Sequence, residues 1–284
     1  MAPERPVLTA RHPWAYPLRV EQLRLARRLR DRRAGTRFAR TLRADDRLPV
    51  VVARHGSILR RRLGATDPRL QETKIVNLRL AASSLDGLVV GPGETVSFWD
   101  RVGAPSARRG FREGIVLFGA EARTGTGGGL CQMANLLYWL ALHTPLTVVE
   151  RHHHGFDPFP DDRRILPFGT GASVFYNYVD LRLRNDTDAT FQLDVWLTQR
   201  DLRGRVRADR ELALAYHVYE VDHRFERDGE AVVRCNEVWR RAVDRTTGRV
   251  VADERLMANR ARVAYRVDPA LAEAGAGHDP GRAA

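Results

Sequence analysis

The spacing of hydrophobic residues predicts helices in the first third of the chain. Residues 18–43 repeat apolar positions at helical intervals among many arginines, and Gly35 is expected to end that helix. A second helix is predicted from Asp67, as N-cap, through Pro68 in its first turn to a stop at Gly87. The first helix should bury a narrow stripe formed by Val20, Leu23, Ala26 and Leu29.

Alternating apolar and polar residues predict strands in the last third of the chain. The alternation is strict over residues 191–198 and looser over 212–221 and 231–241. Asp228-Gly229 and Thr247-Gly248 lie between strand-like runs, as the turns of antiparallel hairpins do. The pattern therefore predicts an α+β fold, with N-terminal helices packed with a mostly antiparallel sheet and one central helix starting at the turn GGGLCQ.

These patterns divide the chain into one folded domain with a short segment on either side. Residues 1–17 contain four prolines and no periodicity, so they are expected to form a loose arm. Residues 269–284 are expected to form a disordered tail. The domain between them, residues 18–268, should contain a helical part, a core motif and a β-rich part, at residues 18–87, 88–185 and 186–268.

The chain is strongly basic, but nothing else in it indicates a nucleic-acid partner. The net charge is +12, and Lys74 is the only lysine among 47 basic residues, so arginines spread along the chain carry the charge. The sequence has no recognisable nucleic-acid-binding motif, no apolar run of about 18 residues and no apolar leader. We therefore expect no nucleic acid, no transmembrane segment, and a cytoplasmic protein with Cys131 and Cys235 reduced.

One stretch in the middle of the chain combines glycine, cysteine and histidine. Three glycines, Gly127–Gly129, precede Cys131, where a helical apolar pattern begins. A β-branched run, Leu146–Glu150, then reads as a buried strand and leads to His152, His153 and His154. The start of a helix favours a thiolate, and glycines leave backbone N–H groups free to hold an oxyanion. A cysteine beside a glycine turn is also often a small buried residue.

These residues are compatible with three kinds of site. In a Cys–His–Asp relay, Cys131 attacks, one of the histidines is the base, and Asp180 or Asp157 orients it, while Gln132 donates to the oxyanion or caps the helix. A zinc site would use His152, His154, Asp157 and Cys131, although the sequence lacks a second closely spaced ligand pair. A non-catalytic module would hold a carboxylate or a peptide terminus at the helix start. The relay has the residue order of papain- and transglutaminase-like folds, and no organic cofactor is expected.

The same region resembles the VanW family, which is named for an accessory protein of B-type vancomycin resistance. The resemblance rests on GGGLCQMANLLYWLALHTPLTVVERHHHGFDPFP, followed by RILPFGTGASVFYNYVDLRLRN, and extends from Pro13 to Trp239. Its motifs are a glycine triplet joined to Cys-Gln, then Glu-Arg-x-x-His, then an Asp-Leu strand ending in Asn. Lys74 and Asn77 match the family's Lys-x-x-Asn. Many members carry an acidic residue where Gly171 stands, so the chain departs from the pattern there.

The resemblance implies an accessory factor linked to glycopeptide resistance or cell-wall precursor metabolism, with a small-molecule or peptide-like cell-wall precursor as its partner. His154 closes the Glu-Arg-x-x-His motif, so we expect it to be the base beside Cys131, with Asp180 as the orienting acid. Such a triad would perform acyl transfer or hydrolysis on an amide or ester. Contacts to the substrate are expected from Gly127, Gly128, Gly129, Gln132, Glu150 and Arg151.

Overall fold

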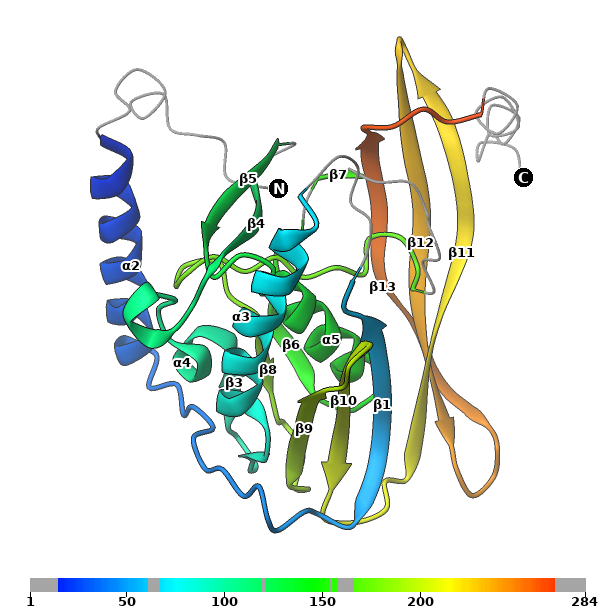
Figure 1. The fold of residues 1–284 in the computed structure, drawn as a ribbon. Coiled ribbons are helices and arrows are strands. Elements are labelled where there is room, and N and C mark those ends of the chain that lie inside the picture. The colour runs from blue at the N-terminus through cyan, green and yellow to red at the C-terminus, as the bar shows by residue number, and fades with distance from the viewer. Residues whose placement is uncertain (1–14, 61–66, 119–120, 154, 158–165, 269–284) are drawn as a thin grey trace.

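The fold is known from a computed structural model that describes residues 15–60, 67–118, 121–153, 155–157 and 166–268. It has the α+β architecture expected from the sequence, with a few helices beside mostly antiparallel sheets (Figure 1). The expected C-terminal tail, the first 14 residues of the expected arm, and His154 lie outside the described residues. The last residues of the expected arm, from Ala15 onward, belong to the first helix.

The first two long helices end close to the glycines that were predicted to stop them. The helical segments in the described residues are α2 (Ala15–Arg33), α3 (Arg69–Leu85), α4 (Phe98–Val102), the 3-10 turn η1 (Ala107–Arg109) and α5 (Cys131–Leu142). Gly35 and Gly87 follow α2 and α3 with φ of +60° and +77°, which glycine adopts at little cost. At the start of α3 the Asp67 carboxylate accepts the N–H of Arg69 at 2.8 Å. Within the described residues, no helix has the length and apolar character needed to cross a bilayer.

The strands form several separate sheets. Their order is β1-β10-β9-β2, β11-β12-β13-β7, β3-β8-β6 and β4-β5. All strand pairs are antiparallel except β13 with β7. The strands are β1 (Val50–Ile58), β2 (Leu88–Val90), β3 (Thr95–Ser97), β4 (Glu113–Phe118), β5 (Glu121–Thr126), β6 (Thr147–Glu150), β7 (Phe156–Asp157), β8 (Arg182–Arg184), β9 (Phe191–Leu197), β10 (Asp201–Ala208), β11 (Leu214–Asp228), β12 (Ala231–Asp244) and β13 (Val250–Val263).

The main core lies where α3 and α5 pack against the sheet β1-β10-β9-β2. Helix α5 approaches β10 closely because Gly204 carries no side chain. A Cβ at that position would lie 2.9 Å from Cδ1 of Leu140 and 3.1 Å from Cδ2 of Leu136. The largest fully buried side chains of this core include Phe98, Phe191, Leu78, Leu85, Met133, Leu136, Leu137 and Leu140. The core therefore holds α5 against β1 and β10.

The predicted hairpins of the C-terminal part are confirmed as a second sheet of three long strands. β11, β12 and β13 run side by side and extend beyond the rest of the molecule at the β11–β12 turn (Figure 1). The β11–β12 register shifts between Val221 and Arg224, where Asp222 has a φ of 56°. β7, which follows the histidine cluster in the sequence, pairs with the end of β13 and so belongs to this sheet.

Helix α2 differs from its prediction, because arginine takes part of the place expected for apolar residues. Val20 is buried as expected, but Ala26 is exposed and Leu29 is 41% exposed. Arg27 is only 7% exposed, and its guanidinium contacts the Glu150 carboxylate and donates to the Tyr178 carbonyl at 3.2 Å. Polar anchors to distant segments therefore decide which side of α2 faces the protein, and helical periodicity alone does not reveal them.

Candidate functional site

The glycine triplet forms the turn that joins β5 to α5. All three glycine N–H groups donate to backbone oxygens, at 2.9, 3.0 and 2.9 Å respectively: Gly127 to Arg112, Gly128 to Gly125, and Gly129 to Ile115. These bonds tie the turn to the strands and loop that precede it. The N–H groups expected to hold an oxyanion thus already have partners inside the protein.

Close packing explains why glycine is needed here. A Cβ on Gly128 would lie 2.1 Å from the carbonyl carbon of Gly114, which belongs to β4. Gly129 has a φ of +89°, and a Cβ there would lie 2.1 Å from Cγ of Lys74. Neither position can hold a side chain without moving the backbone or the lysine.

The two residues of the Lys-x-x-Asn motif brace this turn from α3. Asn77 is fully buried, and its amide nitrogen donates to the Gly128 carbonyl at 2.9 Å and the Arg112 carbonyl at 3.0 Å. Its amide oxygen accepts the Arg112 N–H at 2.7 Å. The Lys74 ammonium donates to Gln71 at 2.7 Å and also contacts the Leu59 carbonyl. The sequence identified both residues by resemblance, and the structure gives them a supporting role for the glycine turn.

Cys131 is the first residue of α5 and is half-buried. Its Sγ lies 4.0 Å from the carbonyl oxygen of Val174. The next three N–H groups of the helix donate back to the carbonyls of Gly129 and Leu130 at 3.0–3.2 Å, so most first-turn donors are already used. Burial raises the pKa of the Cys131 thiol, contrary to the lowering expected from a helix start.

Gln132 connects α5 to β1. Its amide nitrogen donates to the Ser57 hydroxyl at 2.9 Å and the Ile58 carbonyl at 3.0 Å. The side chain therefore spans two elements of the core and does not cap its own helix. The donor group that was expected to face an oxyanion is occupied by these two bonds.

The histidine cluster follows β6. Nε2 of His152 lies 3.0 Å from a carboxylate oxygen of Glu150, and the His152 backbone oxygen accepts the Ser173 N–H at 2.7 Å. His153 is exposed. The expected base, His154, lies outside the described residues. β6 is an edge strand whose residues alternate between exposed and half-buried, so the prediction of a buried strand here is wrong.

Asp180, the expected orienting acid, is fully buried at the start of the segment that forms β8. Its carboxylate accepts four hydrogen bonds at 2.5–3.1 Å, from the Ser97 hydroxyl, the Arg182 guanidinium, and the N–H groups of Trp99 and Leu181. Arg182 in turn donates to both oxygens of Asp31 on α2 at 2.6 and 2.7 Å. Cys131 and Asp180 have no hydrogen-bond partner in common among the described residues.

Glu150 extends this polar network to α2. Its carboxylate pairs with Arg27, lies 3.0 Å from His152, and accepts the Asp180 N–H at 3.2 Å. Burial opposes ionisation of Glu150, but hydrogen bonds from His152 and Arg27, with the charge of Arg182, outweigh it and lower the pKa to about 2. Glu150 was expected to contact substrate, and the structure places it in a charge network that holds α2 against β6 and β8.

Arg151 points away from that network. Its guanidinium stacks 4.7 Å above the Tyr138 ring and donates to the carbonyls of Gly171, at 2.9 Å, and Gly169. Burial lowers the pKa of Arg151. Next to it, Asn135 accepts the Ala172 N–H at 2.6 Å. Residues 169–172, which include Gly171 where the chain departs from the family pattern, are thus held by hydrogen bonds from Arg151 and to Asn135 of α5.

The zinc hypothesis gains no support from the described residues. Asp157, one expected ligand and the alternative orienting acid, is buried, forms an ion pair with Arg234 at 3.1 Å and accepts the Tyr265 hydroxyl at 2.9 Å. Throughout the part of the chain that the structure describes, no three His, Cys, Asp or Glu side chains gather as metal ligands would. His154 belongs to the proposed ligand set and lies outside that part.

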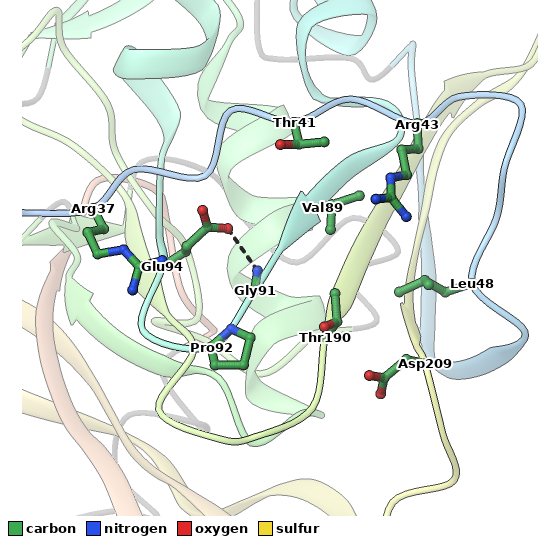
Figure 2. Close-up of a pocket in the computed structure, with 10 residues that line it drawn as sticks. All are labelled: Arg37, Thr41, Arg43, Leu48, Val89, Gly91, Pro92, Glu94, Thr190 and Asp209. Carbon is green, nitrogen blue, oxygen red and sulfur yellow. Dashed lines mark hydrogen bonds between the residues drawn. The ribbon is translucent and has the colours of Figure 1, made fainter.

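A hollow of about 440 Å³ lies beside the turn formed by residues 91–94, Gly-Pro-Gly-Glu. Figure 2 shows Arg37 and Glu94 on one side of it and Arg43 and Asp209 on the other. The Glu94 carboxylate accepts the N–H at the start of the turn at 2.8 Å, as the dashed line in Figure 2 marks. Arg37 has no acidic partner among the described residues. The hollow therefore offers both signs of charge to a ligand.

Comparison with known proteins identifies the relatives of the chain. The family model described as VanW like protein matches residues 73–207. The Vancomycin B-type resistance protein VanW of Enterococcus faecalis is 32% identical over 258 residues, which cover 91% of this chain and 94% of that protein. The chain belongs to the VanW family. The resemblance seen in the sequence is thereby confirmed.

A second relative shares a smaller part of the VanW-like chain. The Uncharacterized protein YoaR of Bacillus subtilis is 30% identical over 112 residues, which cover 38% of this chain and 34% of YoaR. No solved structure gives a significant match. The VanW family model, residues 73–207, contains Lys74, Asn77, the glycine turn, Cys131 and Asp180. The Arg27 and Asp31 partners on α2 lie outside it.

Proposed function

We propose that this protein is an accessory factor in vancomycin resistance or cell-wall precursor metabolism that binds a peptide-like precursor without converting it. The observation that carries this proposal is the 32% identity with the protein of Enterococcus faecalis over 91% of this chain and 94% of that one. That relative is named a vancomycin B-type resistance protein. Similarity along nearly the whole of both chains favours a shared role.

The hydrogen bonding of the motif residues favours binding over catalysis. The N–H groups of the glycine triplet, the amide of Gln132 and the carboxylates of Glu150 and Asp180 all have partners within the protein. A general base needs hydrogen-bond access to the proton it removes, and an oxyanion site needs free donors. In our proposal these residues hold the shape of the protein, and the ligand is recognised elsewhere on it.

The hollow beside residues 91–94 suits a peptide-like ligand because its charges are mixed. Arg37 offers a guanidinium group for a carboxylate, and Glu94 offers oxygens for N–H groups or an ammonium. The other two charged residues of the lining also have partners within the protein, Arg43 with Asp46 at 3.9 Å and Asp209 with Arg210 at 3.1 Å. Arg37 has no acidic partner among the described residues that would compete with a ligand carboxylate. The turn that lines the hollow lies inside the family match at residues 73–207.

Titration calorimetry with the soluble pentapeptide precursor of peptidoglycan tests this proposal. We expect saturable binding that weakens about tenfold in Arg37→Gln, as the loss of one charge-assisted hydrogen bond does. Arg33→Gln is the matched control, because Arg33 is also exposed and without an acidic partner among the described residues. Absence of binding, or equal losses in both variants, would contradict the proposal. In Enterococcus faecalis without its own VanW, expression of the parent protein should change vancomycin susceptibility. Expression of the Arg37→Gln variant should not.

Thiol catalysis is a second candidate function. Its support is that Cys131 opens α5 and remains half-buried instead of fully enclosed. In this mechanism Cys131 attacks an amide or ester carbonyl, His154 removes the thiol proton, and Asp180 orients His154. The leaving amine or alcohol takes that proton from His154, and water then releases the acyl group. The raised pKa of the thiol opposes this candidate.

Iodoacetamide labelling across pH separates the two candidates. If Cys131 is a catalytic thiol, it labels at pH 6.5 faster than the denatured protein, and His154→Ala abolishes the difference. If the protein only binds, Cys131 labels no faster than the denatured chain. Cys235 is the internal control, because it is buried on β12 and burial raises its pKa too.

A further inference from the structure

A second cavity lies at the other end of α5, between β1 and β11. It encloses about 530 Å³. Basic side chains reach it from four separate segments: Arg54 from β1, His143 from the end of α5, His217 from β11, and Arg245 from the turn after β12. No motif links these residues in the sequence. The cavity lies between the main core sheet, which contains β1, and the long C-terminal sheet, which contains β11.

This cavity has no carboxylate in its lining. Two of the three arginines on the neighbouring strand β10 form ion pairs, Arg203 with Asp201 at 2.9 Å and Arg207 with Asp194 at 2.6 Å, and the third, Arg205, lies 4.8 Å above the Trp196 ring. By contrast, the Arg54 and Arg245 guanidinium groups have no acidic partner in the part of the chain that the structure describes. Like charges placed together without a counter-charge repel one another, so the protein gains nothing in stability from this arrangement.

Two acidic groups on the segments around the cavity already have partners within the protein. Glu254 accepts from Arg240, which itself lies 5.1 Å above the Tyr216 ring at the cavity. Asp244, the residue before Arg245, accepts from the N–H and hydroxyl of Thr247 at 2.7 and 2.8 Å. An external anion is therefore the available counter-charge.

His143 is arranged to donate to or accept from a ligand with one nitrogen. Its Nδ1 lies 2.9 Å from the Trp139 carbonyl, and since a carbonyl only accepts, Nδ1 carries a hydrogen. Nε2 is left for the cavity. Burial lowers the pKa of His143, and the nearby His217 and Arg240 lower it further. A bound anion would oppose these effects, because it stabilises the imidazolium form.

We propose that this cavity binds the phosphate group of a small phosphorylated molecule. Two guanidinium groups supply forked donors that match phosphate oxygens, and two imidazoles add further donors. The volume of about 530 Å³ exceeds that of one phosphate, and Val52, Ala53 and Ala215 provide apolar surface for the rest of the ligand. Cys131 lies about 18 Å away along the 12-residue helix, so this site is separate from the glycine turn.

Calorimetric titration of the full chain with pyrophosphate at constant ionic strength tests the assignment, with sodium chloride and citrate as comparison ligands. We expect one saturable site for pyrophosphate, no saturation with chloride, and weaker binding of citrate. Arg54→Gln and Arg245→Gln should each weaken pyrophosphate binding about tenfold. Both residues are exposed, so the variants should keep the thermal unfolding profile of the parent protein.

Arg227→Gln is the matched control. Arg227 lies on β11, as His217 does, but it is exposed near the far end of the strand and outside the cavity lining. Pyrophosphate binding should be unchanged in this variant. No pyrophosphate binding in the parent protein would overturn the proposal, as would equal losses in all three variants or tighter binding of citrate than of pyrophosphate. Because none of these residues lines the hollow beside residues 91–94, loss here leaves pentapeptide binding as an independent measurement.

Discussion

The two ends of α5 use polar groups in opposite ways. At the Cys131 end, backbone N–H groups, the Asn77 amide and the Gln132 amide all bond within the protein, and the thiol pKa is raised. At the His143 end, arginine and histidine side chains gather around an open cavity without a carboxylate in its lining. At the Cys131 end the hydrogen-bond donors have partners within the protein, and at the His143 end side-chain donors are available to a ligand.

This difference separates residues that shape the protein from residues that are available to a ligand. The sequence motifs concentrate at the satisfied end, where close packing demands glycine at positions 128 and 129. The unsatisfied end has no motif, because its residues come from segments far apart in the chain. Reactive residue types in a motif therefore do not by themselves mark the place of binding.

The largest effect that tests this comparison is expected at the glycine turn. Gly128→Ala would put a Cβ 2.1 Å from the Gly114 carbonyl carbon, so β4 and the turn must separate. We expect a loss of about 4 kcal/mol or more in the free energy of unfolding. Urea unfolding followed by circular dichroism measures it.

Gly155→Ala is the matched control, because a Cβ there meets nothing within 4 Å. Its free energy of unfolding should change by less than about 0.5 kcal/mol. If Gly128→Ala were as mild as this control, the glycine turn would not be a packing element, and a ligand-binding role for it would regain support.

Glu150 should show the next largest effect on stability, and the size of this effect depends on pH. Folding lowers the pKa of Glu150 from the ordinary glutamate value of 4.5 to about 2, a difference worth about 3 kcal/mol. A depressed pKa contributes stability that is complete above the unfolded value and is lost as the pH falls toward the folded one. Glu150→Gln should therefore cost about 3 kcal/mol at pH 7, and the difference should shrink between pH 4.5 and about 2. Urea unfolding between pH 7 and pH 3 follows this loss.

Glu72→Gln provides the comparison for Glu150. Glu72 also pairs with an arginine, Arg60, at 2.6 Å, but both side chains are exposed, so solvent screens the pair. Its replacement should cost much less at pH 7. Equal losses in the two variants would mean that burial of the Glu150 network contributes nothing, and that Glu150 is as free to contact a ligand as a surface carboxylate.

The features that the sequence predicted correctly are local ones. Gly35 and Gly87 end helices because their positive φ is inexpensive for glycine, and the C-terminal hairpins follow from alternation and turn residues. The family was recognisable from the order of short motifs. Each of these depends on residues close together in the chain.

The roles of the site residues depend on partners that no local pattern contains. Arg27 meets Glu150 across 123 residues and Arg182 meets Asp31 across 151 residues, so neither helical spacing nor strand alternation could reveal the network. The sequence suggested no role for Lys74 and Asn77. Their role became clear only from the hydrogen bond that the Asn77 amide donates to the glycine turn. The opposite charges of Asp180 and Arg182, two residues apart in the sequence, were the available signal that an ion pair lies there.

The smallest effect on stability is expected at the unsatisfied end of α5, and it tests the comparison from the other side. Arg54 has no acidic partner among the described residues, and its neighbour across the β1–β10 pair is another cation, Arg205 on β10. Removing its charge should therefore leave the free energy of unfolding unchanged or raise it, by no more than about 0.5 kcal/mol. Because Arg54 is exposed and salt screens its repulsion from Arg205, any gain should be larger at 10 mM than at 150 mM salt. Thermal unfolding of Arg54→Gln at both salt concentrations measures this. A loss of more than about 1 kcal/mol would show that Arg54 supports the fold, as Glu150 does, and the two ends of α5 would then not differ in kind.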